Sequence, residues 1–170
     1  MMNDRAKKGS ERKIVIERIY AASIEDVWEL WTTEHGIESW WGPDGFSVKV
    51  HQLDLRAGGE MRYAMTAVDP AQIRFMNQAG MPTTTEAKLT YTAIVPRKSI
   101  AYTHRADFIP GVEPYDVGNK VEFFAEHGNV RMVLELDPMH SDEWTQRALM
   151  GMESQLGKLA RVHLARGATK

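Results

Sequence analysis

The feature that most restricts the possible folds is a long amphipathic segment near the C-terminus, at about residues 141–166. It opens with Ser141, Asp142 and Glu143, which is typical of a helix N-cap followed by acidic residues in the first turn. Side chains at helical spacing then follow, and they are Ala148, Met152, Leu156, Leu159 and His163. One face of this predicted helix is therefore apolar and must be buried. Gly167 is the predicted stop signal.

Most of the preceding chain alternates between apolar and polar residues, which predicts strands. The alternating segments lie at about residues 13–20, 46–51, 60–65, 87–93, 100–104, 120–123 and 130–136. Ser23 predicts the N-cap of one short helix, and a second is expected at about residues 33–40. We interpret residues 69–82 as an extended loop, because they contain two prolines and a glycine. The predicted fold is α+β: two short helices after strand 1, and a curved antiparallel sheet of about seven strands around the long C-terminal helix.

Composition limits the functional classes. The 170 residues suit one domain, with residues 1–12 as a disordered tail and residues 13–170 folded. A net charge of −2 gives no reason to expect nucleic acid or an anionic membrane as a partner. The chain has no cysteine, which is compatible with a cytoplasmic location, and no apolar run long enough to span a membrane. The six histidines form no compact ligand spacing, so we expect neither a metal nor a cofactor.

Four stretches resemble a known family. Trp40–Phe46 (WWGPDGF) resembles the signature W-G-P-x-G-F, and Asp54–Gly59 (DLRAGG) resembles the turn D-x-R-x-G-G. Residues 91–103 resemble the segment Y-x-E-I-x-P-P-x-x-L-x-Y-T, and Gly151–Met152 stands where a Gly-Trp pair is usual. Together they are similar to homologues of the activator of heat-shock protein 90 ATPase, within the START and polyketide cyclase-like superfamily. This resemblance implies a helix-grip fold with an apolar cavity between helix and sheet.

Two departures from the family pattern affect that cavity. Ala93 stands where relatives usually carry Glu, and Met152 replaces the tryptophan of the last helix. The candidate cavity lining comprises apolar, aromatic and histidine side chains that alternation and helical spacing place on the inner face. These candidates are Trp40, Trp41, Phe46, Met61, Tyr63, Met65, Tyr91, Tyr102, His104, Phe123, Met132, Met152, Leu156 and His163. A solid core is the competing interpretation.

Three functions remain open. The first is binding of a small hydrophobic or aromatic molecule, with a Tyr or His group orienting it and residues 42–45 and 69–82 gating the entrance. The second is a cyclase- or hydrolase-like enzyme that uses His104, and no catalytic residue can be assigned for it. The third is a chaperone-interaction module that exposes Ile73, Phe75 and Met81. A monomer and a homodimer are equally expected.

Overall fold

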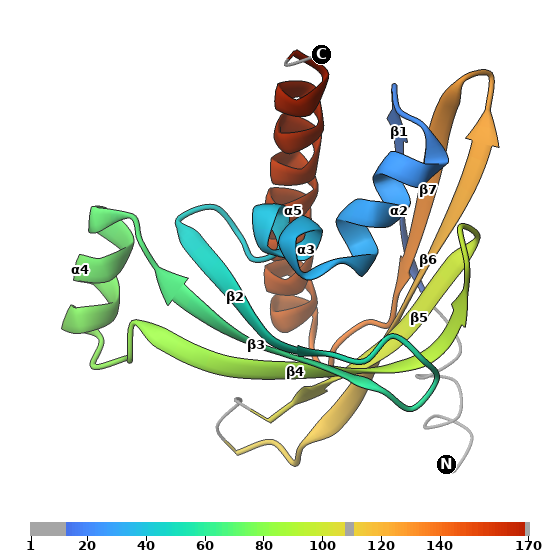
Figure 1. Ribbon diagram of the computed structural model, residues 1–170. Coiled ribbons are helices and arrows are strands. Elements are labelled where there is room, and N and C mark those ends of the chain that lie inside the picture. The colour runs from blue at the N-terminus through green and yellow to red at the C-terminus, as the bar shows by residue number, and fades with distance from the viewer. Residues whose placement is uncertain (1–12, 108–110, 169–170) are drawn as a thin grey trace, which may run out of the picture.

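A long helix stands on the concave side of a strongly curved sheet in the computed structural model (Figure 1). The structure describes residues 13–107 and 111–168, with side chains as far as residue 162, so the predicted tail 1–12 lies outside the described residues. The elements in order are β1 (Ile14–Tyr20), α2 (Ile24–Thr32), α3 (Glu34–Trp40), β2 (Phe46–Leu53), β3 (Glu60–Ala67), α4 (Pro70–Gln78), β4 (Thr84–Val95), β5 (Ser99–Ala106), β6 (Tyr115–Glu126), β7 (Asn129–Leu136) and α5 (Asp142–Ala168). The α+β helix-grip prediction is confirmed.

The seven strands form one antiparallel sheet in the order β1-β7-β6-β5-β4-β3-β2. Strands β2 to β7 pair with their neighbours in sequence, whereas β1 pairs with β7 and forms one edge of the sheet. The tight turn between β6 and β7 has φ 52° at His127 and φ 79° at Gly128. Positive φ at both central residues is what a two-residue type I′ hairpin turn requires. Alternation sends one set of side chains toward α5, and Val121, Met132 and Leu134 on this face are fully buried.

A bulge in β4 corrects the inner-face assignment at the end of that strand. The pairing with β5 runs Tyr91 to Tyr102 and then Ala93 to Ala101, so Thr92 is the extra residue. One inserted residue reverses the side-chain alternation beyond it. Ala93, which the sequence pattern placed inside, is therefore exposed, and Ile94 packs against the core instead.

The first short helix after β1 begins at the predicted cap Ser23, and the second begins after Thr33, the first residue of its predicted range. The Ser23 hydroxyl accepts a hydrogen bond from the Asp26 amide at 3.1 Å, and the Thr33 hydroxyl accepts one from the Gly36 amide at 2.9 Å. Such bonds satisfy amides that have no partner inside the helix. Both helices lie over the concave face of the sheet, and they bury Leu30, Trp31 and further apolar residues toward it (Figure 1).

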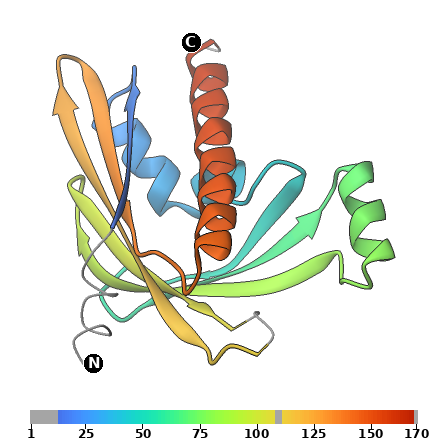
Figure 2. The ribbon, with the colours of Figure 1, turned by 180° about the vertical axis from the view of Figure 1, so that it is seen from behind.

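The predicted loop at residues 69–82 is wrong, because Pro70–Gln78 form helix α4. Asp69 is its N-cap and accepts a hydrogen bond from the Gln72 amide at 3.1 Å, while Pro70 occupies the first helical turn. Proline suits that position because its missing N–H would have no partner there. In Figures 1 and 2, α4 projects beyond the ends of β3 and β4, away from α5. A gate over the helix–sheet interior is therefore not formed by this segment.

The C-terminal helix α5 begins at Asp142, one residue after the predicted cap Ser141. Its buried contact is made by Leu156 and Leu159, whereas Ala148, which we expected on the buried stripe, is exposed. The helix runs to Ala168 and thus passes Gly167, the predicted stop. No helix among the described residues combines the length and apolar character that a membrane span requires.

Candidate functional site

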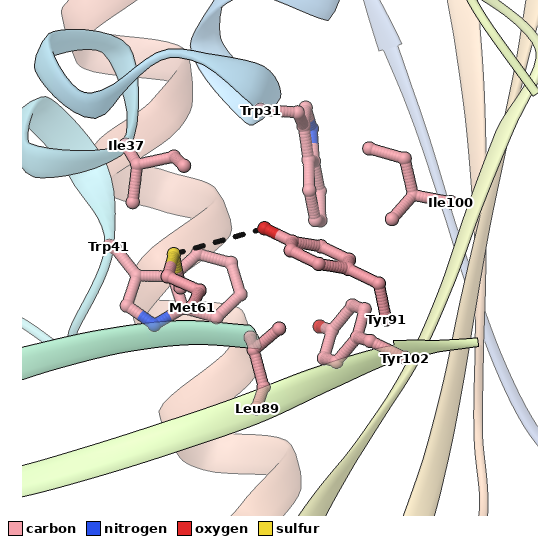
Figure 3. A pocket seen from close by; sticks show the side chains of 8 residues that line it. All are labelled: Trp31, Ile37, Trp41, Met61, Leu89, Tyr91, Ile100 and Tyr102. Carbon is pink, nitrogen blue, oxygen red and sulfur yellow. Dashed lines mark hydrogen bonds between the residues drawn. The ribbon is translucent and has the colours of Figure 1, made fainter. Parts of the chain in front are cut away.

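A small cavity lies between the short helices α2 and α3 and the centre of the sheet (Figure 3). We expected the cavity between the long helix and the sheet, but no residue of α5 lines this one. Its volume is about 10 Å³, which is close to the space that one water molecule needs. Helices α2 and α3 and the loop after them contribute Trp31, Ile37 and Trp41 to its wall. The strands β3, β4 and β5 contribute Met61, Leu89, Tyr91, Ile100 and Tyr102.

An aromatic cluster centred on Trp31 forms the helix side of this cavity. The Trp31 ring meets Trp40, Trp41 and Phe123 edge to face, with centroid distances of 4.8, 5.9 and 5.9 Å. Trp41 continues the cluster toward the sheet, where its ring lies 6.1 Å from that of Tyr102. Edge-to-face pairs are favourable because a positive ring edge meets a negative ring face. The cluster explains why little empty space remains under these helices.

The two tyrosines in the cavity wall are neutral. Burial raises the pKa of both Tyr91 and Tyr102 well above the ordinary value for tyrosine. The Tyr91 hydroxyl donates only to the Met61 sulfur, over 3.9 Å, and a thioether is a weak acceptor. In Figure 3 the Tyr91 hydroxyl points across the cavity toward Met61. The Tyr91 hydroxyl can therefore exchange this weak acceptor for a stronger one at little cost in free energy.

The turn Asp54–Gly59 holds the backbone of Tyr91 in place. The Gly58 amide donates to the Tyr91 carbonyl at 2.7 Å, and the Tyr91 amide donates to the Gly59 carbonyl at 2.8 Å. Gly59 has no room for a side chain, because an added Cβ would lie 2.1 Å from the Asp54 carbonyl oxygen. The D-x-R-x-G-G pattern therefore serves to pin a cavity residue by backbone contacts just before the bulge in β4.

The turn Gly42–Phe46 anchors the long helix. The Gln155 side chain accepts a hydrogen bond from the Gly42 amide at 2.8 Å. The Lys158 ammonium donates to the carbonyls of Gly42 and Phe46 at 3.1 and 3.2 Å, and its burial lowers the lysine pKa. Arg161 pairs with Asp44 at 2.5 Å. The W-G-P-x-G-F stretch is thus a docking surface for α5.

His104 lies on the inner face of β5 beside a buried amide. Its Nδ1 is 3.1 Å from Nδ2 of Asn119, which also donates to the Val117 carbonyl at 3.2 Å. Because Nδ2 can only donate, His104 Nδ1 accepts and the imidazole is neutral, with its proton on Nε2. Burial lowers the pKa of His104, which agrees with this neutral form. The Asn119 oxygen is buried and has no partner among the described residues.

A sequence model of one family covers most of the chain. The model of the Activator of Hsp90 ATPase homolog 1-like proteins matches residues 21–163, a range that includes both signature turns and the cavity wall. The chain belongs to this family. No protein with a curated description matches it significantly.

Several solved structures have the same fold as this protein over nearly the whole chain. The AHSA1 protein from Silicibacter pomeroyi has a TM-score of 0.70 and 20% identity, covering 91% of this chain and 99% of its own. A protein from Mycobacterium smegmatis has a TM-score of 0.69 and 22% identity, covering 93% and 92% respectively. The AHSA1-like protein from Aeromonas hydrophila has a TM-score of 0.65 and 19% identity, covering 92% and 94%. At these identities the likeness concerns the fold alone.

The predicted lining residues of this family member fall into separate groups. Four of them line the cavity, namely Trp41, Met61, Tyr91 and Tyr102. Others are packed in or against the core outside its wall, and these are Trp40, Tyr63, Met65, Met132, Met152 and Leu156. Phe46 is partly buried at the anchoring turn, His104 lies beside Asn119, and Phe123 lines an open groove on the other side of Trp31. The side chain of His163 lies outside the described residues.

Four cavity residues were absent from the sequence-based list: Trp31, Ile37, Leu89 and Ile100. Leu89 and Ile100 lie on the apolar face of their strands that the alternation of the sequence predicts, so periodicity alone identifies them. Trp31 and Ile37 come from the short helices, whose place relative to the sheet was not predicted from the sequence. Among the described residues, no three His, Asp or Glu side chains gather as a metal site would require.

Proposed function

We propose that the protein binds a small hydrophobic or aromatic molecule at the cavity beneath Trp31 and Trp41. The family and its fold are consistent with ligand binding. The observation that carries the proposal is an apolar hollow with uncharged walls at the point where the short helices meet the sheet. The polar groups of its wall are the hydroxyls of Tyr91 and Tyr102 and the indole N–H groups of Trp31 and Trp41. The Trp31 nitrogen is buried and has no hydrogen-bond partner among the described residues.

Binding there requires side chains to move. Pockets for small molecules usually measure about 300–1,000 Å³, whereas this cavity measures about 10 Å³. Met61 is the side chain best suited to yield, because an unbranched thioether adapts its shape easily. The Tyr91 hydroxyl, now over the Met61 sulfur at 3.9 Å, would turn to the guest and donate a hydrogen bond. Ligand binding in this proposal enlarges a small hollow instead of filling a ready pocket.

The test uses naphthalene and 1-naphthol as probes, with thermal unfolding and tryptophan emission as readouts. Both compounds are expected to raise the melting temperature and to shift the emission, because two of the five tryptophans, Trp31 and Trp41, line the site. Tyr91→Phe keeps the ring and removes the hydroxyl, so it should weaken 1-naphthol about fivefold, as one lost hydrogen bond predicts, and leave naphthalene unchanged. If neither probe changes either readout up to its solubility limit, the proposal is wrong.

A second candidate, a protein-interaction module, has an observation of its own. Around α4, Phe75 is 60% exposed, Val68 55% and Met81 49%, which is unusual for large apolar side chains in one region. The family description suggests an Hsp90-type ATPase as the partner. The double variant Phe75→Ser, Met81→Ser should abolish stimulation of such an ATPase, whereas Met150→Ser, at an exposed site on α5, should not. Equal stimulation by both variants would remove this candidate.

A further inference from the structure

A wide groove opens on the side of α2 that faces away from the small cavity. Its volume is about 600 Å³, within the range of small-molecule sites. It lies between the start of α2 and the tips of the β4–β5 and β6–β7 hairpins, which Figure 1 places on the same side of the molecule as α2. Ile24, Val95 and Phe123 give it an apolar surface. The groove is therefore large enough, and apolar enough, for the body of a small ligand.

Two cations line this groove without a counterion. Arg97 and Lys98 form no ion pair with any residue that the structure describes. The carboxylates along the same groove are already engaged elsewhere: Glu126 accepts two hydrogen bonds from Arg131 at 3.1 Å, and Glu122 lies 3.9 Å from the Lys120 ammonium. The two cations and two carboxylates of the groove carry no net charge together. Because both carboxylates have cationic neighbours of their own, the charges of Arg97 and Lys98 remain available to an anion.

The turn that presents these cations has an uncommon residue at a strained position. Lys98 donates its amide to the Val95 carbonyl at 2.9 Å, and the two central residues of the turn are Pro96 and Arg97. Arg97 has φ 62°, so with proline before it the turn is of type II, in which glycine is the usual residue at that place. An arginine there costs conformational energy that glycine would avoid. Strain at such a position points to a role for the side chain itself.

A contact between two aromatic rings connects the groove with the cavity wall. Phe123 lines the groove, and its ring meets that of Trp31, which lines the small cavity, at 5.9 Å and 75°. Phe123 also packs on Trp28, at a centroid distance of 5.7 Å. A rotation of Phe123 away from these two tryptophans would expose the Trp31 ring to the groove.

We propose that the groove is the entrance to the ligand site and that Arg97 and Lys98 form a carboxylate subsite at its rim. The ligand class is then an amphipathic carboxylic acid, whose carboxylate stays with the two cations while its apolar part lies over Phe123 toward Trp31. This inference rests on the proposed function, since it names the chemistry and the route of the molecule bound there. Phe123 acts as the gate, and the cations select an acid over the corresponding alcohol.

The experiment compares octanoate with 1-octanol by titration calorimetry on the full chain at low salt. Octanoate should bind more tightly than 1-octanol, by up to about 25-fold, because each of the two exposed cations contributes up to about fivefold. Arg97→Gly removes one cation and places the preferred residue at φ 62°, so its melting temperature should not fall. Arg97→Gly and Lys98→Gln should each weaken octanoate about fivefold and leave 1-octanol unchanged. Lys88→Gln, which removes an exposed cation on β4 that does not line the groove, is the matched control.

Each outcome decides one question. Equal affinity for octanoate and 1-octanol, or octanoate affinity unchanged in both groove variants, would overturn the carboxylate subsite while the naphthalene and 1-naphthol results still stood. Failure of those two probes would overturn the interior site, whatever octanoate does. If sedimentation shows a dimer that Arg97→Gly dissociates, a second copy of the chain occupies the groove and the small-molecule subsite is wrong.

Discussion

Replacing Leu156 by alanine tests whether α5 shares the core on which the proposed site depends. Leu156 is 2% exposed and belongs to the main hydrophobic cluster. Transferring a buried leucine side chain to water costs about 1.5–3 kcal/mol, and the hole left behind brings the total to about 2–5 kcal/mol. Alanine is the best helix former, so the loss cannot be assigned to helix propensity. For a chain of this size we expect the melting temperature to fall by roughly 5–15 °C.

The control lies on the same helix. Met150 is 72% exposed, so Met150→Ala should change the free energy of unfolding by no more than about 0.5 kcal/mol. Urea unfolding followed by tryptophan emission measures both variants, with the slope of the transition as a check that the unfolded state is unchanged. If Leu156→Ala costs as little as Met150→Ala, α5 does not share the core. The reasoning that places α5 in the same hydrophobic core as the cavity wall would then be refuted.

Three further variants test local features. Burial lowers the pKa of His104, so the unfolded chain gains a proton at higher pH than the folded chain does, and stability is lost as pH falls below about 6.5. The variant His104→Gln should therefore lose less stability than the wild type between pH 7.5 and 5.5. Equal losses of the two proteins in urea unfolding would contradict the neutral, buried state of His104. Gly59→Ala would place a Cβ 2.1 Å from the Asp54 carbonyl and should destabilise by at least about 1–3 kcal/mol, measured by the same unfolding. Gly151→Ala meets nothing within 4 Å in the middle of α5 and should instead stabilise by about 0.5–1 kcal/mol; a loss would mean that the space above it is not open.

Periodicity and turn chemistry were sufficient to predict the order of the elements other than α4, because each signal there is local. The β6–β7 hairpin follows from His127-Gly128, and the caps Ser23 and Ser141 mark the starts of α2 and α5. Helix α4 was missed although its signals are equally local. Asp69-Pro70 is a cap followed by a residue suited to the first turn, and Gly80 with φ 72° follows its end. The two prolines and the glycine were read as loop residues instead of helix boundaries.

The side-chain positions at the site could not be derived from alternation alone, for two physical reasons. The bulge at Thr92 reverses the pattern within β4, so Ile94 and not Ala93 faces inward, and no feature of the local sequence announces that insertion. The cavity also draws on Trp31 and Ile37, whose place depends on how α2 and α3 cross the sheet. Such crossing angles are set by packing between distant segments, which a single sequence does not encode in any one stretch.

The arrangement of the rings limits which guests can enter. The ring pairs around Trp31 and Trp41 cross at 61–84°, so every ring edge there is already directed at a neighbouring face. A flat guest therefore cannot slide between two stacked rings, and it must displace an edge from a face, at a cost of about 0.5–1.5 kcal/mol for each pair broken. Phe123 has two such contacts, to Trp28 and to Trp31, whereas the Trp31 ring has three, to Trp40, Trp41 and Phe123. Opening at Phe123 breaks fewer pairs than opening at Trp31, which is why the entry route runs through the groove.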